Sequence, residues 1–286
     1  MEFMEIRTFY WYDRLISNTR YQLKRLFGKR NNAQFKCGNA GDIYARQLLE
    51  HYYGLNVSNI REPGNRILSV GSIGHRAGNG DLLCGVGLKD PQQLPLVGTD
   101  ITIYGLRGPL SFDAFKAGGF DMSKIKFLYD PGLLIKYLIP QTPIEPSVVS
   151  FIPHYRERFN YRGRLPKEIK LVDIDNDPQV VARSILKSKL VYASSLHGII
   201  FSHSLGVPCI YVKPQTEEPE FKFIDYYESV NLPYKKPLSS IASFDFQRDS
   251  DTPADIRVIE SDFYFPTVEE LTSRGIITES QKERLG

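Results

Sequence analysis

The fold of this 286-residue chain is decided by Lys189-Leu-Val-Tyr-Ala-Ser-Ser-Leu-His-Gly-Ile-Ile-Phe-Ser-His-Ser-Leu-Gly-Val-Pro-Cys-Ile-Tyr-Val212. Leu190–Ala193 is apolar enough for a buried strand, and the residues after the Ser-Ser turn predict a helix that ends at Gly206. Val207–Val212 is a second apolar strand. A strand, a helix and a second strand in this order form a crossover between parallel strands, which is the unit of α/β sheets.

The turn of this crossover places Ser194, Ser195 and His197 where a strand leads into a helix. A helix N-terminus has unpaired backbone N–H groups and the positive end of the helix dipole, so it can bind phosphate or carboxylate. An imidazole at such a position can transfer a proton near neutral pH. An N-capping serine followed by a packing histidine would explain the same residues, and the turn alone does not separate these two interpretations.

Short apolar strands alternate with helices over most of the chain. The other predicted strands are Arg7–Tyr12, Arg66–Val70, Leu82–Val86, Ile101–Leu106, Phe127–Tyr129, Val148–Ile152 and Lys170–Asp173. The predicted helices are Arg14–Arg30, Ile43–Tyr53, Leu110–Ala117, Gln179–Ser188 and one that begins at Pro266. This alternation predicts a doubly wound α/β fold.

Pro140–Pro146 is rich in proline and favours neither helix nor strand, so we interpret it as a linker. It predicts two domains, residues 1–143 with a basic insertion at 13–37 and residues 144–286, with the last helix packing back on the N-terminal domain. Ligands of open α/β sheets bind beyond the carboxyl ends of the strands. We therefore expect the functional site in a cleft between the two halves.

The charge of the chain is unevenly distributed. Its net charge is +3, and residues 13–37 contain seven cations against one acid, so the remainder is slightly acidic. This distribution argues against a nucleic-acid partner, because no basic stripe runs through the body of the chain. The basic helix predicted at 14–30 either contacts the inner face of the cytoplasmic membrane peripherally or is a solvated surface helix.

The three cysteines are odd in number and widely spaced, without a C-x-x-C pair, so neither a disulfide framework nor a zinc site is expected. The N-terminus lacks the apolar core of a signal peptide, and no apolar run is long enough to span a bilayer. We expect a cytoplasmic location.

Several polar residues follow predicted strands or glycine turns. His154 and Arg156 follow Val148–Ile152, and Arg156 can bind phosphate or carboxylate with two parallel hydrogen bonds. Alternatively, His154 and Arg156 lie in a surface loop whose charges have no role in binding. In the first half the corresponding positions are Asn39, Gly41, Asp42, His75 and Arg107.

The carboxylates Asp173, Asp175 and Asp177 superficially resemble a metal-binding run. The Gly and Glu of a calcium loop are missing, and Asp177 before Pro178 is explained as a helix N-cap, so no metal site is predicted. The glycine loops match neither the G-x-x-x-x-G-K-[ST] pattern of nucleotide phosphate loops nor G-x-G-x-x-G, so no nucleotide cofactor is expected.

Nine short motifs occur in the order seen in polysaccharide pyruvyl transferases, and the chain resembles that family over about residues 38–232. The motifs are Gly38–Asp42, Gly71–Ile73, Gly80–Asp81 with Gly85–Gly87, Leu106–Pro109, Tyr129–Gly132, Pro153–Tyr155, Ser194–Gly198, Leu205–Pro208 and Lys222–Tyr227. The resemblance implies two Rossmann-like domains facing a central cleft, as in GT-B glycosyltransferases. It also implies transfer of the enolpyruvyl group of phosphoenolpyruvate to a sugar of a surface polysaccharide or its lipid-linked precursor, with formation of a pyruvate ketal and release of phosphate.

The resemblance also implies roles for individual residues. Ser195-Leu196-His197 matches the phosphoenolpyruvate-binding motif, with His197 as the catalytic histidine and Asp42 as a candidate acid or base. Many members carry Arg-Leu-His at this motif, so Arg156 or Lys222 would have to supply the missing cation. The candidate substrate-binding residues are Ser194, Ser195, His154, Arg156, Lys222, Asn39, Gly41, His75 and Arg107.

The implied chemistry requires one group that gives a proton to the methylene carbon of the donor and one that takes protons from sugar hydroxyls. A helix N-terminus lowers the pKa of His197, which suits a base, and enclosure of Asp42 would raise its pKa, which suits an acid. Two alternatives remain: a GT-B-type glycosyltransferase that uses a nucleotide sugar, and a non-catalytic sugar- or phosphate-binding protein.

Overall fold

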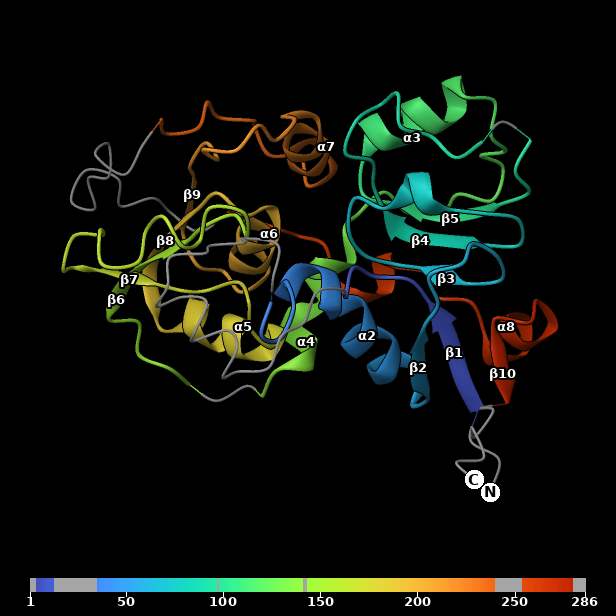
Figure 1. The fold of residues 1–286 in the computed structure, drawn as a ribbon, viewed down its shortest axis with the longest axis horizontal. Coiled ribbons are helices and arrows are strands. Elements are labelled where there is room, and N and C mark those ends of the chain that lie inside the picture. Colours follow the sequence, from blue (N-terminus) through green and yellow to red (C-terminus); the bar gives the residue numbers. More distant parts are fainter. Residues whose placement is uncertain (1–3, 13–34, 97, 141–142, 240–253, 280–286) are drawn as a thin grey trace.

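Two sheets organise the protein (Figure 1), whose structure is a computed structural model that describes residues 4–12, 35–96, 98–140, 143–239 and 254–279. The first sheet has the order β10-β1-β3-β4-β5, with β2 also paired to β1. All its pairings are parallel except that of β10 with β1. Its strands are β1 (Met4–Thr8), β2 (Asn56–Asn59), β3 (Ile67–Leu68), β4 (Leu82–Val86), β5 (Thr102–Leu106) and β10 (Ile277–Glu279).

The second sheet is parallel throughout, in the order β7-β6-β8-β9. Its strands are β6 (Val148–Ile152), β7 (Ile169–Leu171), β8 (Ser188–Ala193) and β9 (Cys209–Tyr211). The predicted crossover runs through β8, α6 (Leu196–Ser204) and β9. The α/β fold class with parallel sheets is therefore confirmed.

Helices cover both sheets (Figure 1), which explains why central strands such as β4 are buried along their whole length. The other α-helices are α2 (Ala40–Tyr53), α3 (Pro109–Ala117), α4 (Ile135–Leu138), α5 (Pro178–Leu186), α7 (Phe221–Ser229) and α8 (Val268–Ser273). Short 3₁₀ turns are η1 (Gly74–Arg76), η2 (Pro131–Leu134) and η4 (Glu260–Asp262). None of the helices in the described ranges is long and apolar enough to cross a bilayer.

The local signals for these elements are visible in the sequence. The predicted and observed bounds of β4 and β6 agree. Asp177 caps α5, accepting hydrogen bonds from the backbone N–H groups of Gln179 and Val180, as predicted. Thr267 caps α8 in the same way through the N–H of Glu270.

Two predicted strands require correction. The first strand was expected at Arg7–Tyr12 but lies at Met4–Thr8, because Phe9 leaves the sheet and packs edge-on against Trp11. Phe127–Tyr129 forms only a single bridge between Phe127 and Gly105. The chain turns into η2 immediately afterwards, since the Asp130 side chain accepts a hydrogen bond from the Gly132 N–H. The predicted basic helix 14–30 lies outside the described residues.

The two sheets share one apolar core. Tyr44 and Leu48 of α2 belong to the same buried cluster as Val181 of α5, Ile199 of α6 and Leu134 of η2. In Figure 1, α2 and α4 accordingly lie between the two sheets. Because α2 follows β1 in the chain and packs on the helices of the second sheet, it joins the two halves through their interiors.

A buried ion pair also joins the halves, at α3 and α7 (Figure 1). Arg107, which follows β5, donates from Nε to Oδ2 of Asp225 on α7 at 3.0 Å, and neither residue is exposed. Ser111 adds its backbone N–H at 2.9 Å and its hydroxyl at 2.6 Å to the same carboxylate. At Gly108 a Cβ atom would lie 2.1 Å from the Asp225 carbonyl oxygen, so this close approach requires glycine.

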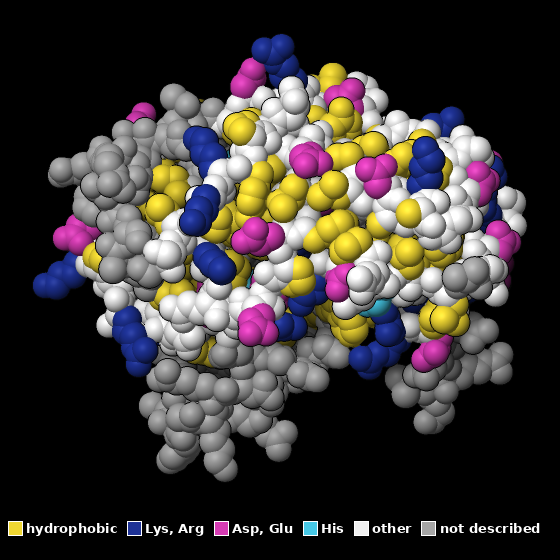
Figure 2. All heavy atoms as spheres, turned by 90° about the horizontal axis from the view of Figure 1, so that it is seen from above, with side chains coloured by type: hydrophobic (Ala, Val, Ile, Leu, Met, Phe, Trp, Pro, Cys, Tyr) yellow, Lys and Arg dark blue, Asp and Glu magenta, His cyan; other side chains and the backbone are white. Residues whose placement is uncertain are grey.

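On the face seen from above in Figure 2, Lys and Arg side chains are interspersed with Asp and Glu between hydrophobic patches. The coloured side chains on this face therefore carry charges of both signs.

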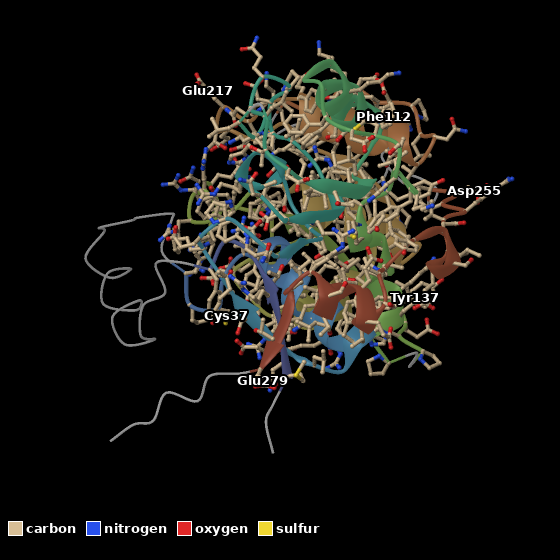
Figure 3. All side chains as sticks on the ribbon, turned by 90° about the vertical axis from the view of Figure 1, so that its right-hand side faces the viewer. Cys37, Phe112, Tyr137, Glu217, Asp255 and Glu279 are labelled. Carbon is tan, nitrogen blue, oxygen red and sulfur yellow. The ribbon has the colours of Figure 1, made fainter. Side chains whose placement is uncertain are left out.

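We predict that Asp225→Ala lowers the free energy of unfolding by about 3–5 kcal/mol, because it leaves the Arg107 guanidinium buried without its carboxylate. Denaturant unfolding followed by circular dichroism measures the change. Asp255→Ala is the matched control, since Asp255 pairs with Arg257 on the surface with side chains 75% and 89% exposed, and it lies at the edge of the molecule in Figure 3. Equal effects of the two variants would contradict the role given to Asp225.

Candidate functional site

The carboxyl ends of β6 and β8 bring together the residues predicted on the two strands. The Ser194 hydroxyl accepts a hydrogen bond from the backbone N–H of His154 at 2.8 Å and donates to Oε1 of Glu157. Ser194 is fully buried, so its hydroxyl is committed to joining the two strand ends. Ser195 is the N-cap of α6 and accepts from the Gly198 N–H at 3.4 Å.

His197 lies in the first turn of α6, pressed against the first turn of α2. A Cβ atom at Gly41 would lie 2.1 Å from Nδ1 of His197, so any larger residue would displace the imidazole. The motif glycine at position 41 is therefore explained by the close approach of two helix N-termini. Each of these ends contributes the positive end of a helix dipole to the same region.

A carboxyl group, that of Asp130, lies close to this histidine, with its Oδ1 atom 4.0 Å from Nε2 of His197. Both side chains are buried, and within the described ranges neither Nε2 of His197 nor Oδ2 of Asp130 has a hydrogen-bond partner. Burial lowers the pKa of His197 to about 3, assisted by Arg107 and Lys222. Burial raises the pKa of Asp130 to about 6, against the opposing effect of Arg107.

This pair combines a neutral imidazole with a carboxyl that changes protonation near neutral pH. Asp130 is part of the quoted Tyr129–Gly132 motif, but its proximity to His197 was not predicted. The available signal was its place at the end of a predicted strand, because strand ends at one sheet edge lie near each other.

Asp42 has a different environment. It lies half-buried in the first turn of α2, and its Oδ2 atom accepts a hydrogen bond from the Asn39 side chain at 2.8 Å. Its Oδ1 atom faces Gly71, 3.8 Å from the position of a Cβ atom there. Asp42 therefore lies beside the glycine turn that follows β3, while Asp130 lies beside His197.

A second cluster surrounds Glu218, in the loop between β9 and α7. Its Oε1 atom lies 3.0 Å from Nη1 of Arg156 and 3.6 Å from Nε2 of His154. Its Oε2 atom lies 2.6 Å from Nζ of Lys222 and 3.2 Å from Nζ of Lys89. The predicted residues His154, Arg156 and Lys222 are thus brought together, and sequence reasoning missed Glu218 and Lys89.

The cluster around Glu218 is strongly coupled electrostatically. The Glu218 side chain is only 2% exposed, which opposes ionisation, but Lys222 and the neighbouring groups lower its pKa to about 2. Burial lowers the pKa of His154 to about 3, with Lys222 acting in the same direction. Lys222 lowers the pKa of both His154 and His197, so the cluster and the His197–Asp130 pair share one electrostatic field.

Arg107 and His75 lie on the first-sheet side of this region. The Arg107 guanidinium donates to Asp225, to the Ser72 hydroxyl at 2.7 Å and to the Leu88 carbonyl at 2.5 Å. These hydrogen bonds of the Arg107 guanidinium are all to other groups of the protein. Its positive charge also lowers the pKa of His197. Burial lowers the pKa of His75, and Arg76 and Lys89 add to this.

The carboxylates of Asp173, Asp175 and Asp177 all contact groups of the protein itself. Asp175 accepts hydrogen bonds from the backbone N–H groups of residues 36–38, which positions the chain before α2. Asp173 pairs with Arg158 and Arg162. Across the described ranges, no group of three or more His, Cys, Asp or Glu side chains is arranged to hold a metal ion.

We predict that the stability of the protein falls as the pH is lowered from about 6.5, partly because His197 stays neutral in the folded state and is protonated in the unfolded state. His197→Gln should reduce this slope by up to one proton, about 1.4 kcal/mol per pH unit. Asp130 acts in the opposite direction between about pH 4 and 6 and is present in both proteins.

Denaturant unfolding between pH 4.5 and 7.5 measures this slope. His51→Gln is the control, because His51 is exposed and should leave the profile unchanged. A His197→Gln profile parallel to that of the unchanged protein would contradict the prediction.

Comparison with known proteins adds independent information. The family model for polysaccharide pyruvyl transferase matches residues 96–216, which contain Arg107, Asp130 and the whole β8–α6–β9 crossover. The chain is 30% identical over 202 residues to an uncharacterized protein of Acanthamoeba polyphaga mimivirus, covering 66% of this chain and 69% of that protein. A solved structure of a functionally uncharacterized protein from Klebsiella pneumoniae aligns with a TM-score of 0.40 and 14% identity, covering 74% of this chain and 94% of that chain.

The family match falls on the segment that holds the buried histidine, its carboxyl neighbour and Arg156. The order of the nine motifs had indicated the same family, and the model match now confirms it. The chain therefore belongs to the polysaccharide pyruvyl transferase family, whose enzymes transfer pyruvyl groups to polysaccharides.

Proposed function

We propose that this protein uses phosphoenolpyruvate to place a pyruvate ketal on a sugar of a surface polysaccharide or its lipid-linked precursor. The observation that carries the proposal is the convergence of Lys89, Arg156 and Lys222 on one carboxylate, beside His154. The site combines this cationic cluster, suited to an anionic donor, with a neutral imidazole beside a carboxyl of raised pKa. The donor would lie on the side of residues 144–286 and the sugar on the side of residues 1–143, about a GT-B-like cleft.

The donor carries a phosphate and a carboxylate, and both require cations and oriented donors. Ser195 stands where many members have an arginine, so other residues would have to supply that charge. Arg156, Lys222 and Lys89 converge on one carboxylate, that of Glu218, and so already form a group able to bind an anion. We assign these three residues to the donor and the α6 N-terminus to one of its anionic groups.

The proton transfers can be assigned from the pKa values. Protonated Asp130 gives its proton to the methylene carbon of the donor, and the resulting oxocarbenium-like carbon is attacked by a sugar hydroxyl. Neutral His197 takes the proton of that hydroxyl and returns it to Asp130 through one bridging water, because the two groups lie 4.0 Å apart. A second hydroxyl then attacks, the C–O bond to phosphate breaks, and phosphate leaves with the second hydroxyl proton.

Asp42 is assigned to the acceptor. Its carboxylate is half-buried beside Gly71, at the end of the first sheet, where it can accept a hydrogen bond from a sugar hydroxyl. We assign the role of general acid to Asp130 rather than to Asp42, because burial raises the pKa of Asp130.

We predict that His197→Ala and Asp130→Asn each lower kcat by about 10²–10⁴-fold, the usual contribution of general acid–base catalysis. Asp42→Ala should act chiefly through the KM of the acceptor. The measurement is phosphate release from phosphoenolpyruvate with a panel of lipid-linked sugars, together with mass analysis of the product.

Asp255→Asn serves as the surface control, and circular dichroism verifies that each variant is folded. Near-normal turnover by folded His197→Ala and Asp130→Asn proteins would overturn the assignment. Sugar transfer from a nucleotide sugar without consumption of phosphoenolpyruvate would overturn the proposed reaction itself.

A further inference from the structure

Glu218 occupies the meeting point of cations from both halves of the protein. Lys89 follows β4 of the first sheet, Arg156 follows β6 of the second sheet, and Lys222 lies in α7. Each places a nitrogen within 3.2 Å of the Glu218 carboxylate. A single carboxylate thus joins groups that are otherwise far apart in the sequence.

Glu218 is the shared partner of several cations. Among the described residues, three cationic side chains form ion pairs with Glu218, which supplies one negative charge. Lys222 is only 7% exposed, and a buried ammonium group without an anion beside it is costly. The geometry therefore calls for an anion at this point, and a phosphate group would offer more charge and more acceptor oxygens than Glu218 does.

Glu218 differs from its acidic neighbours. Glu217 and Glu220 are exposed, and Glu217 lies at the edge of the molecule in Figure 3, while the Glu218 side chain is 2% exposed. Residues 213–220 form neither helix nor strand between β9 and α7. Withdrawal of Glu218 therefore breaks no backbone ladder, and the loop is held on one side by the bond from the Gln215 N–H to Glu157 at 2.6 Å.

We propose that Glu218 is an internal competitor that fills the anion site of Lys89, Arg156 and Lys222 in the unliganded protein, and that a phosphate-bearing ligand displaces it together with residues 216–219. The identification of that ligand with phosphoenolpyruvate rests on the proposed function. The competition lowers the apparent affinity for the anion, because binding requires the state in which Glu218 has left. The return of Glu218 after the reaction would help to expel phosphate.

The proposal is tested by the binding of inorganic phosphate, measured by isothermal titration calorimetry without any acceptor. Glu218→Gln removes the competing charge and keeps the shape of the side chain, so phosphate should bind at least about tenfold more tightly than to the unchanged protein. Glu217→Gln is the matched control, with the same chemical change on the adjacent exposed residue, and should leave the affinity unchanged. Equal or weaker binding by Glu218→Gln would overturn the proposal and make Glu218 a fixed partner of Lys222.

A second measurement uses the unchanged protein and so does not depend on the folding of the variant. Amide hydrogen exchange of Thr216, Glu217 and Glu218 should become faster when phosphate is added, because this part of the loop leaves the cluster. Unchanged or slower exchange of this loop at saturating phosphate would contradict displacement.

These outcomes are separate from those that test the proposed function. Tighter phosphate binding by Glu218→Gln together with no turnover of phosphoenolpyruvate would retain the anion switch and reject the reaction. Turnover with no effect of Glu218→Gln on phosphate binding would retain the reaction and reject the switch.

Discussion

The buried pair of Arg107 and Asp225 is the interaction on which the site depends. It fixes α7 of the second half against the end of β5 and the start of α3 in the first half. Lys222 lies three residues before Asp225, on the same side of the helix, so the pair also determines where the Lys222 ammonium group is placed. Replacing such a pair by apolar residues can be neutral for stability, whereas removing one partner is not. We interpret its value here as positional, because it fixes α7, and with it the Lys222 ammonium group, at the junction of the two halves.

The same positions show what sequence could and could not reveal. Caps such as Asp177 and Ser195, and strands such as β4 and β6, were predictable because their signals lie within a few residues of one another. The neighbourhood of Asp130 and His197 depends on the packing of η2 against α6, between segments more than 60 residues apart. Strand periodicity predicts that both residues lie at strand ends, but it does not state which ends meet.

Glu218 illustrates a different limit. In sequence it is one of several acidic residues in a proline-containing loop, which is typical of a solvated segment. Only the convergence of Lys89, Arg156 and Lys222 distinguishes it from Glu217, and those three residues come from three separate elements. The family resemblance indicated that a cation was missing at Ser195 and that Arg156 or Lys222 could replace it, but it indicated neither Lys89 nor the carboxylate on which all three converge. Ion pairs between residues that are far apart in the chain leave no pattern within a short stretch of sequence.

The two clusters act on each other through charge. In the unliganded protein, burial and the charges of Arg107 and Lys222 keep His197 neutral and weakly basic. If a phosphate dianion takes the place of the Glu218 carboxylate, the negative charge near Lys222 increases, and the effect of Lys222 on His197 is more fully compensated. The pKa of His197 then rises by the part that Lys222 contributes, while burial and Arg107 continue to lower it. The histidine would thus accept hydroxyl protons more readily once the donor has bound, so exchange of one anion for another would couple donor binding to the first proton transfer.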